Sequence, residues 1–326
     1  MQLPSELRRA IEQELATSSA AALRSASTHI SQLYRAEGAA SVQALSSDEQ
    51  RAAYLAVRLP ATYAAVVEAL RWTRESCSAP IYSVFDLGSG PGTALWAASA
   101  VFPELNSFTG FERDSRLIEI ARRLCQSSEQ ADLRSAQWLQ GDLTAEIPAG
   151  KWDLVICSYA LNELRDTARA ELVRKAWERT AKFLVIIEPG TKAGFANVLA
   201  ARSRLLGQDA TIAAPCPNAL ACPMAAKSGE QHGDWCHFAA RVERTADHRH
   251  LKQATLGHED EKFSYIAFSR TSVQSPPSRI VRHPRIFSGY TQLTLCKAGE
   301  ISNPTITRSM KENWRRLKRK GWGDGW

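Results

Sequence analysis

Two hydrophobic periodicities divide the chain. Up to about residue 75 the apolar residues recur at helical spacing, most clearly over residues 54–70, where Pro60 predicts a break or kink. From residue 81 onward, short apolar runs alternate with helical stretches, which is the pattern of βαβ units and a parallel sheet. The expected strands are residues 81–87, 107–112, 136–142, 152–158 and 182–189, and the expected helices are residues 93–102, 115–124 and 168–180. Two later runs, residues 263–269 and 290–296, are expected to complete the sheet.

This pattern predicts an α/β protein with three regions. Residues 1–75 form a helical N-terminal region, residues 76–300 a Rossmann-like domain, and residues 301–326 a basic C-terminal tail. A cysteine-rich segment at about residues 205–260 is expected to be an insertion after the fifth strand. The 326 residues and their 44% hydrophobic content suffice for a sizeable core.

The cellular setting is predicted from what the sequence lacks. No apolar run is long enough to span a bilayer, so no membrane association is expected. Residues 1–15 have the pattern of an amphipathic, partly acidic helix and lack the layout of a secretory signal or a transit peptide. We therefore expect a cytoplasmic, monomeric protein whose thiols stay reduced and form no disulfide framework.

A glycine-rich turn, F-D-L-G-S-G-P-G, follows the first expected strand at residues 85–92. Glycines at alternate positions let the backbone turn tightly and approach a ligand without a Cβ in the way. In sheets of this kind, ligands bind at the carboxyl ends of the strands. Acids stand at three of these ends, and Glu112 follows the turn by about 20 residues, as expected for a carboxylate that holds ribose hydroxyls.

This order of an acid, a glycine turn and two further acids resembles class I methyltransferases that use S-adenosylmethionine (AdoMet). The resemblance implies an AdoMet pocket formed by Asp86, Gly88, Gly90, Gly92, Glu112, Asp142 and Ser158. A nicotinamide dinucleotide fits less well, because the turn is preceded by an acid and is shaped for a small amino-acid nucleoside instead of a pyrophosphate. A degenerate Rossmann fold that binds nothing is the alternative.

The sequence identifies no catalytic residue. Asn162 and Glu163 follow the fourth strand, where many methyltransferases carry the groups that approach the target, but they also fit the start of a helix. Cys157 lacks the preceding proline typical of 5-methylcytosine enzymes and is interpreted as a packed strand residue. Methyl transfer from a sulfonium often needs little more than positioning, so a missing base does not exclude catalysis.

Four cysteines form the second candidate site, with the spacing C-x5-C-x13-C-x59-C at Cys216, Cys222, Cys236 and Cys296. Converging thiolates bind soft metals or iron–sulfur clusters, and a proline after each of the first two is typical of iron–sulfur proteins. The spacing alone leaves an iron–sulfur cluster and zinc open, with His232 or His237 as a ligand in a Cys3His zinc site. Four unrelated buried thiols are the alternative, and this is our interpretation of the other cysteines, Cys77, Cys125 and Cys157.

The net charge of +7 and the isoelectric point near 9.1 favour an acidic partner. Residues 311–320 hold six cations against one anion, and Trp314 and Trp322 are interleaved or follow closely. Cations with aromatic rings contact phosphates and stack on bases, which predicts nucleic-acid binding. A solvated helix end is the alternative.

Several stretches together resemble the small-ribosomal-subunit methyltransferase-like family, which has bacterial and mitochondrial members. They are A-P-C-P with C-P-M, D-W-C-H-F-A-A-R-V-E-R, H-E-D-E-K-F-S-Y, S-Y-A-L-N-E-L and I-E-P-G-T-K-A-G-F. The resemblance implies an AdoMet-type fold with a 4Fe-4S cluster on Cys216, Cys222, Cys236 and Cys296. It also implies binding to small-subunit rRNA and ribosomal proteins.

The function predicted from the resemblance is an rRNA-directed methyltransferase or a methyltransferase-like assembly factor of the small ribosomal subunit. One alternative is a non-catalytic RNA-binding factor that uses AdoMet as a structural ligand. Another is a zinc-bearing methyltransferase of a protein or small molecule.

Overall fold

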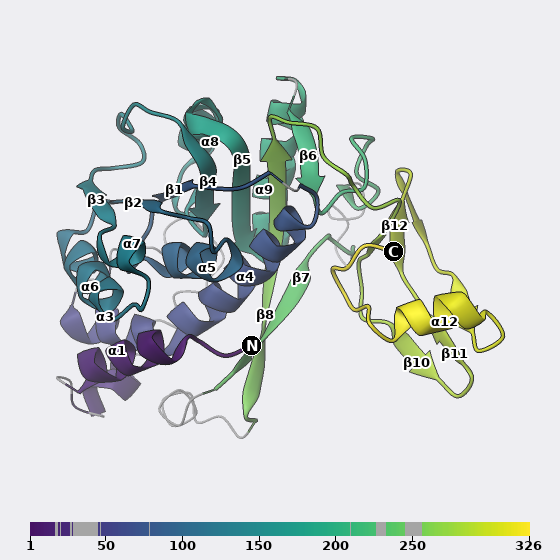
Figure 1. Cartoon of the computed structure of the whole chain (residues 1–326), viewed down its shortest axis with the longest axis horizontal. Helices are drawn as coiled ribbons and strands as arrows, with labels where there is room; N and C mark the ends of the chain where they lie inside the picture. Colours follow the sequence, from purple (N-terminus) through teal and green to yellow (C-terminus); the bar gives the residue numbers. More distant parts are fainter. Residues whose placement is uncertain are drawn as a thin grey trace.

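The computed structural model describes residues 1–16, 19, 21–26, 28, 45, 47–77, 79–208, 210–225, 233–244 and 256–326. Within these residues, a sheet of eight strands carries helices on both faces, and residues 279–326 form a smaller lobe at one end (Figure 1). We call this second part the C-terminal lobe.

The parallel half of the sheet follows the order β3-β2-β1-β4-β5. Its strands are β1 (Ser83–Leu87), β2 (Ser107–Glu112), β3 (Gln137–Gln140), β4 (Trp152–Ser158) and β5 (Thr180–Pro189). All five strands predicted here are found within a few residues of their expected bounds. The Rossmann-like α/β fold predicted from the sequence is thereby confirmed.

The other half of the sheet is antiparallel and is built on one long strand, β8 (His258–Ser269). Residues 263–269 of β8 pair with β5, which confirms the strand predicted there. The opposite edge of β8 is shared by β6 (Thr211–Ala214) and β7 (Phe238–Glu243), which the sequence analysis missed. The cysteine-rich segment thus contributes two short strands to the main sheet.

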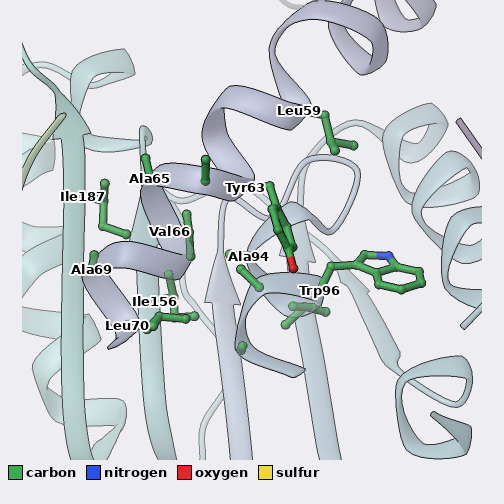
Figure 2. Close-up of a cluster of buried hydrophobic side chains, with 14 of the residues drawn as sticks. Leu59, Tyr63, Ala65, Val66, Ala69, Leu70, Ala94, Trp96, Ile156 and Ile187 are labelled. Carbon is green, nitrogen blue, oxygen red and sulfur yellow. The ribbon is translucent and has the colours of Figure 1, made fainter. Parts of the chain in front are cut away.

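Alternation along the strands divides the core between the two faces of the sheet. On one face, Ile156 and Ile187 pack against apolar side chains of the helices that cover it, including Tyr63 and Val66 (Figure 2). On the other face, Cys157 and neighbouring strand residues pack against a second set of helices. The first set is α1 (Ser5–Leu15), α3 (Asp48–Val57), α4 (Leu59–Arg74), α5 (Thr93–Val101), α6 (Ser115–Gln126) and α7 (Ala131–Arg134), and the second is α8 (Asp166–Arg179) and α9 (Lys192–Leu206).

Helices α3 and α4 meet at the break predicted near Pro60. Ser47 caps α3 by accepting a hydrogen bond from the backbone N–H of Gln50 at 3.2 Å, and α4 starts afresh with the proline in its first turn. Within the described residues no single helix has the length and hydropathy of a membrane span. Together α3 and α4 reach that length and composition, but the pair is bent by 47°.

The C-terminal lobe consists of two small sheets and one helix. One sheet has the order β13-β12-β9 and the other β10-β11-β14. The lobe's core is formed by Ile280, Leu293, Leu295, Ile306 and Leu317. The elements are β9 (Arg279–Ile280), β10 (Arg285–Phe287), β11 (Tyr290–Gln292), β12 (Leu295–Lys297), β13 (Glu300–Ser302), β14 (Thr305–Thr307) and α12 (Lys311–Leu317).

The prediction that residues 290–296 complete the main sheet is wrong. This run is divided between β11 and β12, which belong to different sheets of the lobe. Both edges of β8 are already occupied by β5 and by β6 and β7, so the main sheet offers no place for it beside β8. The apolar residues Leu293 and Leu295 are buried in the lobe's own core instead.

The end of the chain returns to the main domain. The backbone of Gly323 donates to the Ile280 carbonyl at 2.8 Å, and the indole N–H of Trp72 on α4 donates to Asp324 Oδ1 at 3.2 Å. Trp322 packs beside Phe238 of β7. Residues 322–324 are therefore part of the packed structure that joins the lobe to the sheet.

Candidate functional site

The glycine turn after β1 has the conformation that its residues predicted. Gly88, Gly90 and Gly92 have φ values of +75°, +50° and +82°, in the region that favours glycine. A Cβ at Gly92 would lie 2.7 Å from the Trp138 ring, so bulk is excluded there by packing. A Cβ at Gly90 would meet nothing within 4 Å, which leaves open space over the turn.

Glu112, at the end of β2, is fixed by backbone donors. Its Oε2 accepts from the N–H of Gly90 at 2.9 Å, and its Oε1 accepts from the N–H groups of Arg113 and Asp114, each at 2.9 Å. The residue is 9% exposed and lies against the glycine turn. One acid thereby holds together the two loops that would contact a nucleoside.

Asp86, at the end of β1, is buried without a hydrogen-bond partner. It is 1% exposed, and neither carboxylate oxygen has a partner among the described residues. Burial, with a smaller contribution from the charge of Glu112, raises the pKa of Asp86 to about 8. The nearby hydroxyls of Ser89 and Thr93 are also buried without a partner. Unsatisfied polar atoms around an open turn are the property expected of a site shaped for a polar ligand.

A further buried acid stands at the end of β5. Glu188 Oε1 accepts from the N–H of Leu161 at 3.1 Å, and its Oε2 accepts from the Asn197 amide at 2.9 Å. Burial raises the pKa of Glu188 to about 8. The sequence analysis missed Glu188 as a site residue, although an acid directly after the apolar run of residues 183–187 could have indicated it. The carboxyl edge of the sheet is thus rich in acids, which suits a cationic ligand.

Two of the predicted cofactor residues are less enclosed. Asp142 is exposed after β3, and a hydrogen bond from the Thr144 hydroxyl at 2.7 Å lowers its pKa. Ser158 is half-buried at the end of β4. Both lie at the same sheet edge as the glycine turn, and Leu143 beside Asp142 approaches Gly88. Their contact with a cofactor stays a prediction.

The turn after β4 is held by an ion pair that sequence reasoning missed. Tyr159 has φ +58°, and its hydroxyl donates to Glu261 Oε1 at 3.1 Å. Arg58, at the junction of α3 and α4, pairs with the same carboxylate at 3.0 Å.

Cys157 is 2% exposed and packs in the core, so it is a packed strand residue, as predicted. This burial raises the pKa of its thiol well above the ordinary value. Asn162 and Glu163 lie in a 3-10 turn, η2 (Leu161–Glu163).

The four cysteines predicted as ligands line one pocket between the main sheet and the C-terminal lobe. Cys216 follows β6, Cys222 lies in the next loop, Cys236 precedes β7, and Cys296 belongs to β12. Figure 1 shows these strands meeting at the junction. The other lining residues are largely apolar and include Phe238, Val281 and Ile301. Residues as far apart as Cys216 and Cys296 are thus brought together, as the sequence predicted.

The thiols are difficult to ionise in this pocket without a counter-charge. Burial, and then the charges of the neighbouring cysteines, raise the pKa of Cys236 well above its ordinary value and that of Cys296 to about 12. A bound metal or cluster would reverse this by binding the thiolate forms. The donor set and the buried position therefore fit such a group.

Two buried arginines also line the pocket, and the sequence analysis missed both. Arg202 of α9 is 7% exposed, and its guanidinium donates to the Leu220 carbonyl at 2.5 Å. Arg279 of β9 is 2% exposed and donates to the Pro215 carbonyl at 2.8 Å. Both lower the pKa of Cys216, against the larger effect of burial. An arginine among the mainly apolar buried residues of α9 was the available signal for Arg202.

The geometry offers no site for a single ion among the described residues. No group of three or more His, Cys, Asp or Glu side chains there is arranged to hold a metal ion. His237 is not among the pocket's lining residues, and its Nδ1 lies 3.0 Å from the Trp235 carbonyl oxygen. His232 lies outside the described residues.

Comparison with known proteins gives one family. A family model described as mitochondrial small ribosomal subunit Rsm22 matches residues 48–326. The human mitochondrial ribosome assembly protein METTL17 is 27% identical over 300 residues, which cover 83% of this chain and 61% of that protein. The mitochondrial Rsm22-cox11 tandem protein 2 of Schizosaccharomyces pombe is 25% identical over 330 residues, which cover 85% of this chain and 43% of that protein. The chain thus spans about half the length of these curated relatives.

Among solved structures, magnesium protoporphyrin IX methyltransferase from Synechocystis with bound S-adenosylhomocysteine is 13% identical. The match covers 66% of this chain and 85% of that protein's chain, with a TM-score of 0.43.

These comparisons overturn the predicted cytoplasmic location, because the family description and the relatives' names are mitochondrial. That prediction rested largely on residues 1–15. Their amphipathic pattern serves packing, since Leu7 and Ile11 of α1 are buried in the core.

Proposed function

Because this chain belongs to the Rsm22 family, we propose that it is a methyltransferase-like assembly factor of the small ribosomal subunit, with an AdoMet site and a 4Fe-4S cluster. The observation that carries the proposal is the convergence of Cys216, Cys222, Cys236 and Cys296 on one pocket. Its partners are small-subunit rRNA and ribosomal proteins. The name of the human relative and the description of the family support the ribosomal part.

AdoMet is the cofactor that the acidic sheet edge supports best. The open space over Gly90 leaves room for a ligand, and the unpartnered carboxyl of Asp86 would be stabilised as a carboxylate by a cationic one. Glu112 would accept hydrogen bonds from ribose hydroxyls, and its place against the glycine turn supports this role. AdoMet would supply an electrophilic methyl group, and Asp86, Glu112 and the glycine turn would hold and orient it.

An iron–sulfur cluster fits the cysteine pocket better than zinc does. A single zinc ion draws its four ligands within about 2.3 Å of one point, whereas four iron atoms spread the cysteine sulfurs more widely. The four cysteines line one pocket, and among the described residues they form no group that could hold a single metal ion. The buried charges of Arg202 and Arg279 suit the net negative charge of a cluster with four thiolates.

Assembly without methyl transfer is the form of the function that we favour. The hydroxyl of Tyr159, at the turn where methyltransferases carry target-binding groups, is engaged by Glu261. Arg58 pairs with the same carboxylate, so this turn is tied to the junction of α3 and α4.

The test is co-sedimentation of anaerobically purified protein with small and large ribosomal subunits from the same cells, in the presence of AdoMet labelled in its methyl group. We expect binding to immature small subunits and no label transferred to RNA or protein. Equal binding to large subunits would reject the assembly function. Transfer of the label to the RNA would instead identify the protein as an rRNA methyltransferase.

A further inference from the structure

The positive charge of the chain is concentrated in the C-terminal lobe. Residues 279–326 contain eleven lysines and arginines against three acids, a net charge of +8, whereas the whole chain has +7. The preceding 278 residues are therefore close to neutral. An acidic partner attracted by this protein would be drawn to the lobe.

The sheet β10-β11-β14 leaves one face uncovered. Cross-strand partners share a face, and the register pairs Phe287 with Tyr290, and Tyr290 with Thr307. The opposite face carries Ile286, Thr291 and Ile306. Thr291 and Ile306 are buried, and Ile306 packs in the lobe core with Leu317 of α12, whereas Ile286 on β10 is 80% exposed. The helix therefore covers this face at β11 and β14, and the other face is left uncovered. The exposed face carries Arg285, Phe287, Tyr290, Gln292, Thr305 and Thr307.

Two aromatic rings lie on this exposed face. The rings of Phe287 and Tyr290 stack with centroids 4.7 Å apart and planes inclined by 14°, and their residues are 43% and 38% exposed. Neither is needed to fill the lobe core. Exposed aromatic side chains on a small sheet, with arginine, glutamine and threonine beside them, are the features of a base-stacking surface.

We propose that the exposed face of β10-β11-β14 binds unpaired bases of single-stranded RNA through Phe287 and Tyr290, while the surrounding cations of the lobe contact its phosphates. The inference rests on the proposed function for the presence of RNA. It adds that the RNA is unpaired where it meets the lobe, because a duplex does not expose base faces to stacking. The lobe's charge favours RNA over a protein with a mixed surface.

The experiment uses the full chain, purified anaerobically, and a fluorescent oligouridylate of about 15 nucleotides as the probe, with an RNA duplex of the same length for comparison. We expect the wild-type protein to bind the oligouridylate more tightly than the duplex. The double variant Phe287→Ala and Tyr290→Ala should lose about ten- to a hundredfold in affinity for it. The salt dependence of the residual binding should be unchanged, because no cation is removed.

Two matched variants make the result specific. Tyr82→Ala removes a 48%-exposed aromatic ring from the main domain and should bind the oligouridylate as the wild type does. The exchange Phe287→Tyr with Tyr290→Phe keeps two rings and should restore most of the affinity. Iron content and AdoMet binding of all variants should match the wild type, which reports an intact fold.

Two outcomes would overturn the inference. One is that the double alanine variant binds oligouridylate as tightly as the wild type, and the other is that the wild-type protein prefers the duplex. In the first case, loss of binding to small subunits by the same variant would assign this face to a ribosomal protein. If the double variant binds oligouridylate normally while the wild type still co-sediments with small subunits, the inference fails and the proposed function stands. Absence of wild-type co-sedimentation would instead reject the proposed function.

Discussion

The backbone N–H of Gly90 donates to Glu112 Oε2 at 2.9 Å, so the glycine turn after β1 is tied to the end of β2. The same carboxylate also accepts from Arg113 and Asp114 through its other oxygen. This arrangement fixes the turn in its open form before any ligand binds. A site that is already ordered loses little conformational entropy when a cofactor enters.

The first prediction concerns this carboxylate. Glu112→Gln keeps a hydrogen-bond acceptor for Gly90 but removes the charge that would hold ribose hydroxyls. A charged acceptor contributes roughly 1.5–3 kcal/mol, so AdoMet should bind about ten- to a hundredfold more weakly. Calorimetry on the cluster-loaded protein measures the change, and Glu119→Gln on the exposed face of α6 is the control. Unchanged affinity in Glu112→Gln would exclude its role in AdoMet binding.

The second prediction concerns pH and Asp86. The pKa of Asp86 is about 8 in the folded protein and ordinarily 3.8, so the folded state holds a proton that the unfolded state has released. The stability of the folded state should therefore fall as pH rises from about 4 through 8. Asp86→Asn cannot ionise. Between about pH 6 and pH 9 its free energy of unfolding should therefore fall by roughly 1–3 kcal/mol less than that of the wild type.

Thermal unfolding at both pH values, with and without AdoMet, measures this difference. A cationic ligand near Asp86 should reduce the difference in pH dependence between the wild type and Asp86→Asn, because it stabilises the carboxylate. The control is Asp166→Asn, which removes an exposed acid at the start of α8. Equal pH dependence of Asp86→Asn and the wild type would refute the prediction.

The central parallel strands were predictable because they are largely buried on both faces. The apolar runs at residues 154–157 and 183–187 stand out in the sequence as parts of β4 and β5. The strands of the C-terminal lobe have only two or three residues, too few to show a period. Residues 290–296 mislead for this reason, because two short strands adjoin and together resemble one long strand.

The site residues whose role follows from residue type and local spacing were predictable. Residues that reach the site only through contacts between distant parts of the chain were not. The glycine turn, Glu112 and the four cysteines are visible as motifs. Arg279, in contrast, approaches Cys216 only because the lobe folds back onto the segment after β6. The ion pair between Arg58 and Glu261 joins residues 203 positions apart, and no local pattern indicates it.

The third prediction concerns the cysteine pocket. Cys222→Ser should give colourless, poorly soluble protein, because a cluster that joins distant segments contributes its binding energy to folding. Iron and acid-labile sulfide, measured after anaerobic purification, should fall to near zero. Cys125→Ser, on α6 and outside the pocket, should keep both. One zinc per chain without sulfide in the wild type would reject the cluster.

The fourth prediction concerns Arg202 and the electron affinity of the cluster. Removal of a buried positive charge beside the proposed cluster would make an added electron less favourable, so Arg202→Met should shift the cluster's reduction potential to more negative values. Arg202→Lys should restore most of the wild-type potential. Arg204→Met, two residues along α9 and exposed, is the control. If Arg202→Met retains the cluster at an unchanged potential, the guanidinium has no electrostatic role.

The last prediction concerns the cations of α12 and of the turn that follows it, and the packing of this segment decides how to test it. Truncation after Asn313 would also remove Leu317 from the lobe core and Trp322 from its place beside Phe238. Weaker RNA binding by the truncated protein would then have two explanations. One is unfolding of the lobe, and the other is the removal of a phosphate-binding cation. Substitution of exposed cations avoids this problem, and Arg315, Lys318 and Arg319 are all exposed.

The triple glutamine variant of these three residues should bind oligouridylate more weakly, with a smaller dependence on salt. The slope of log affinity against log salt should decrease by about 0.7 to 0.9 for each phosphate that the variant no longer neutralises, because fewer counterions are released. A triple glutamine variant of Arg9, Arg122 and Arg165, exposed cations of the main domain, has the same net charge and should keep the wild-type slope. If both triple variants change the slope equally, net charge alone attracts the RNA, and Arg315, Lys318 and Arg319 do not bind phosphate directly.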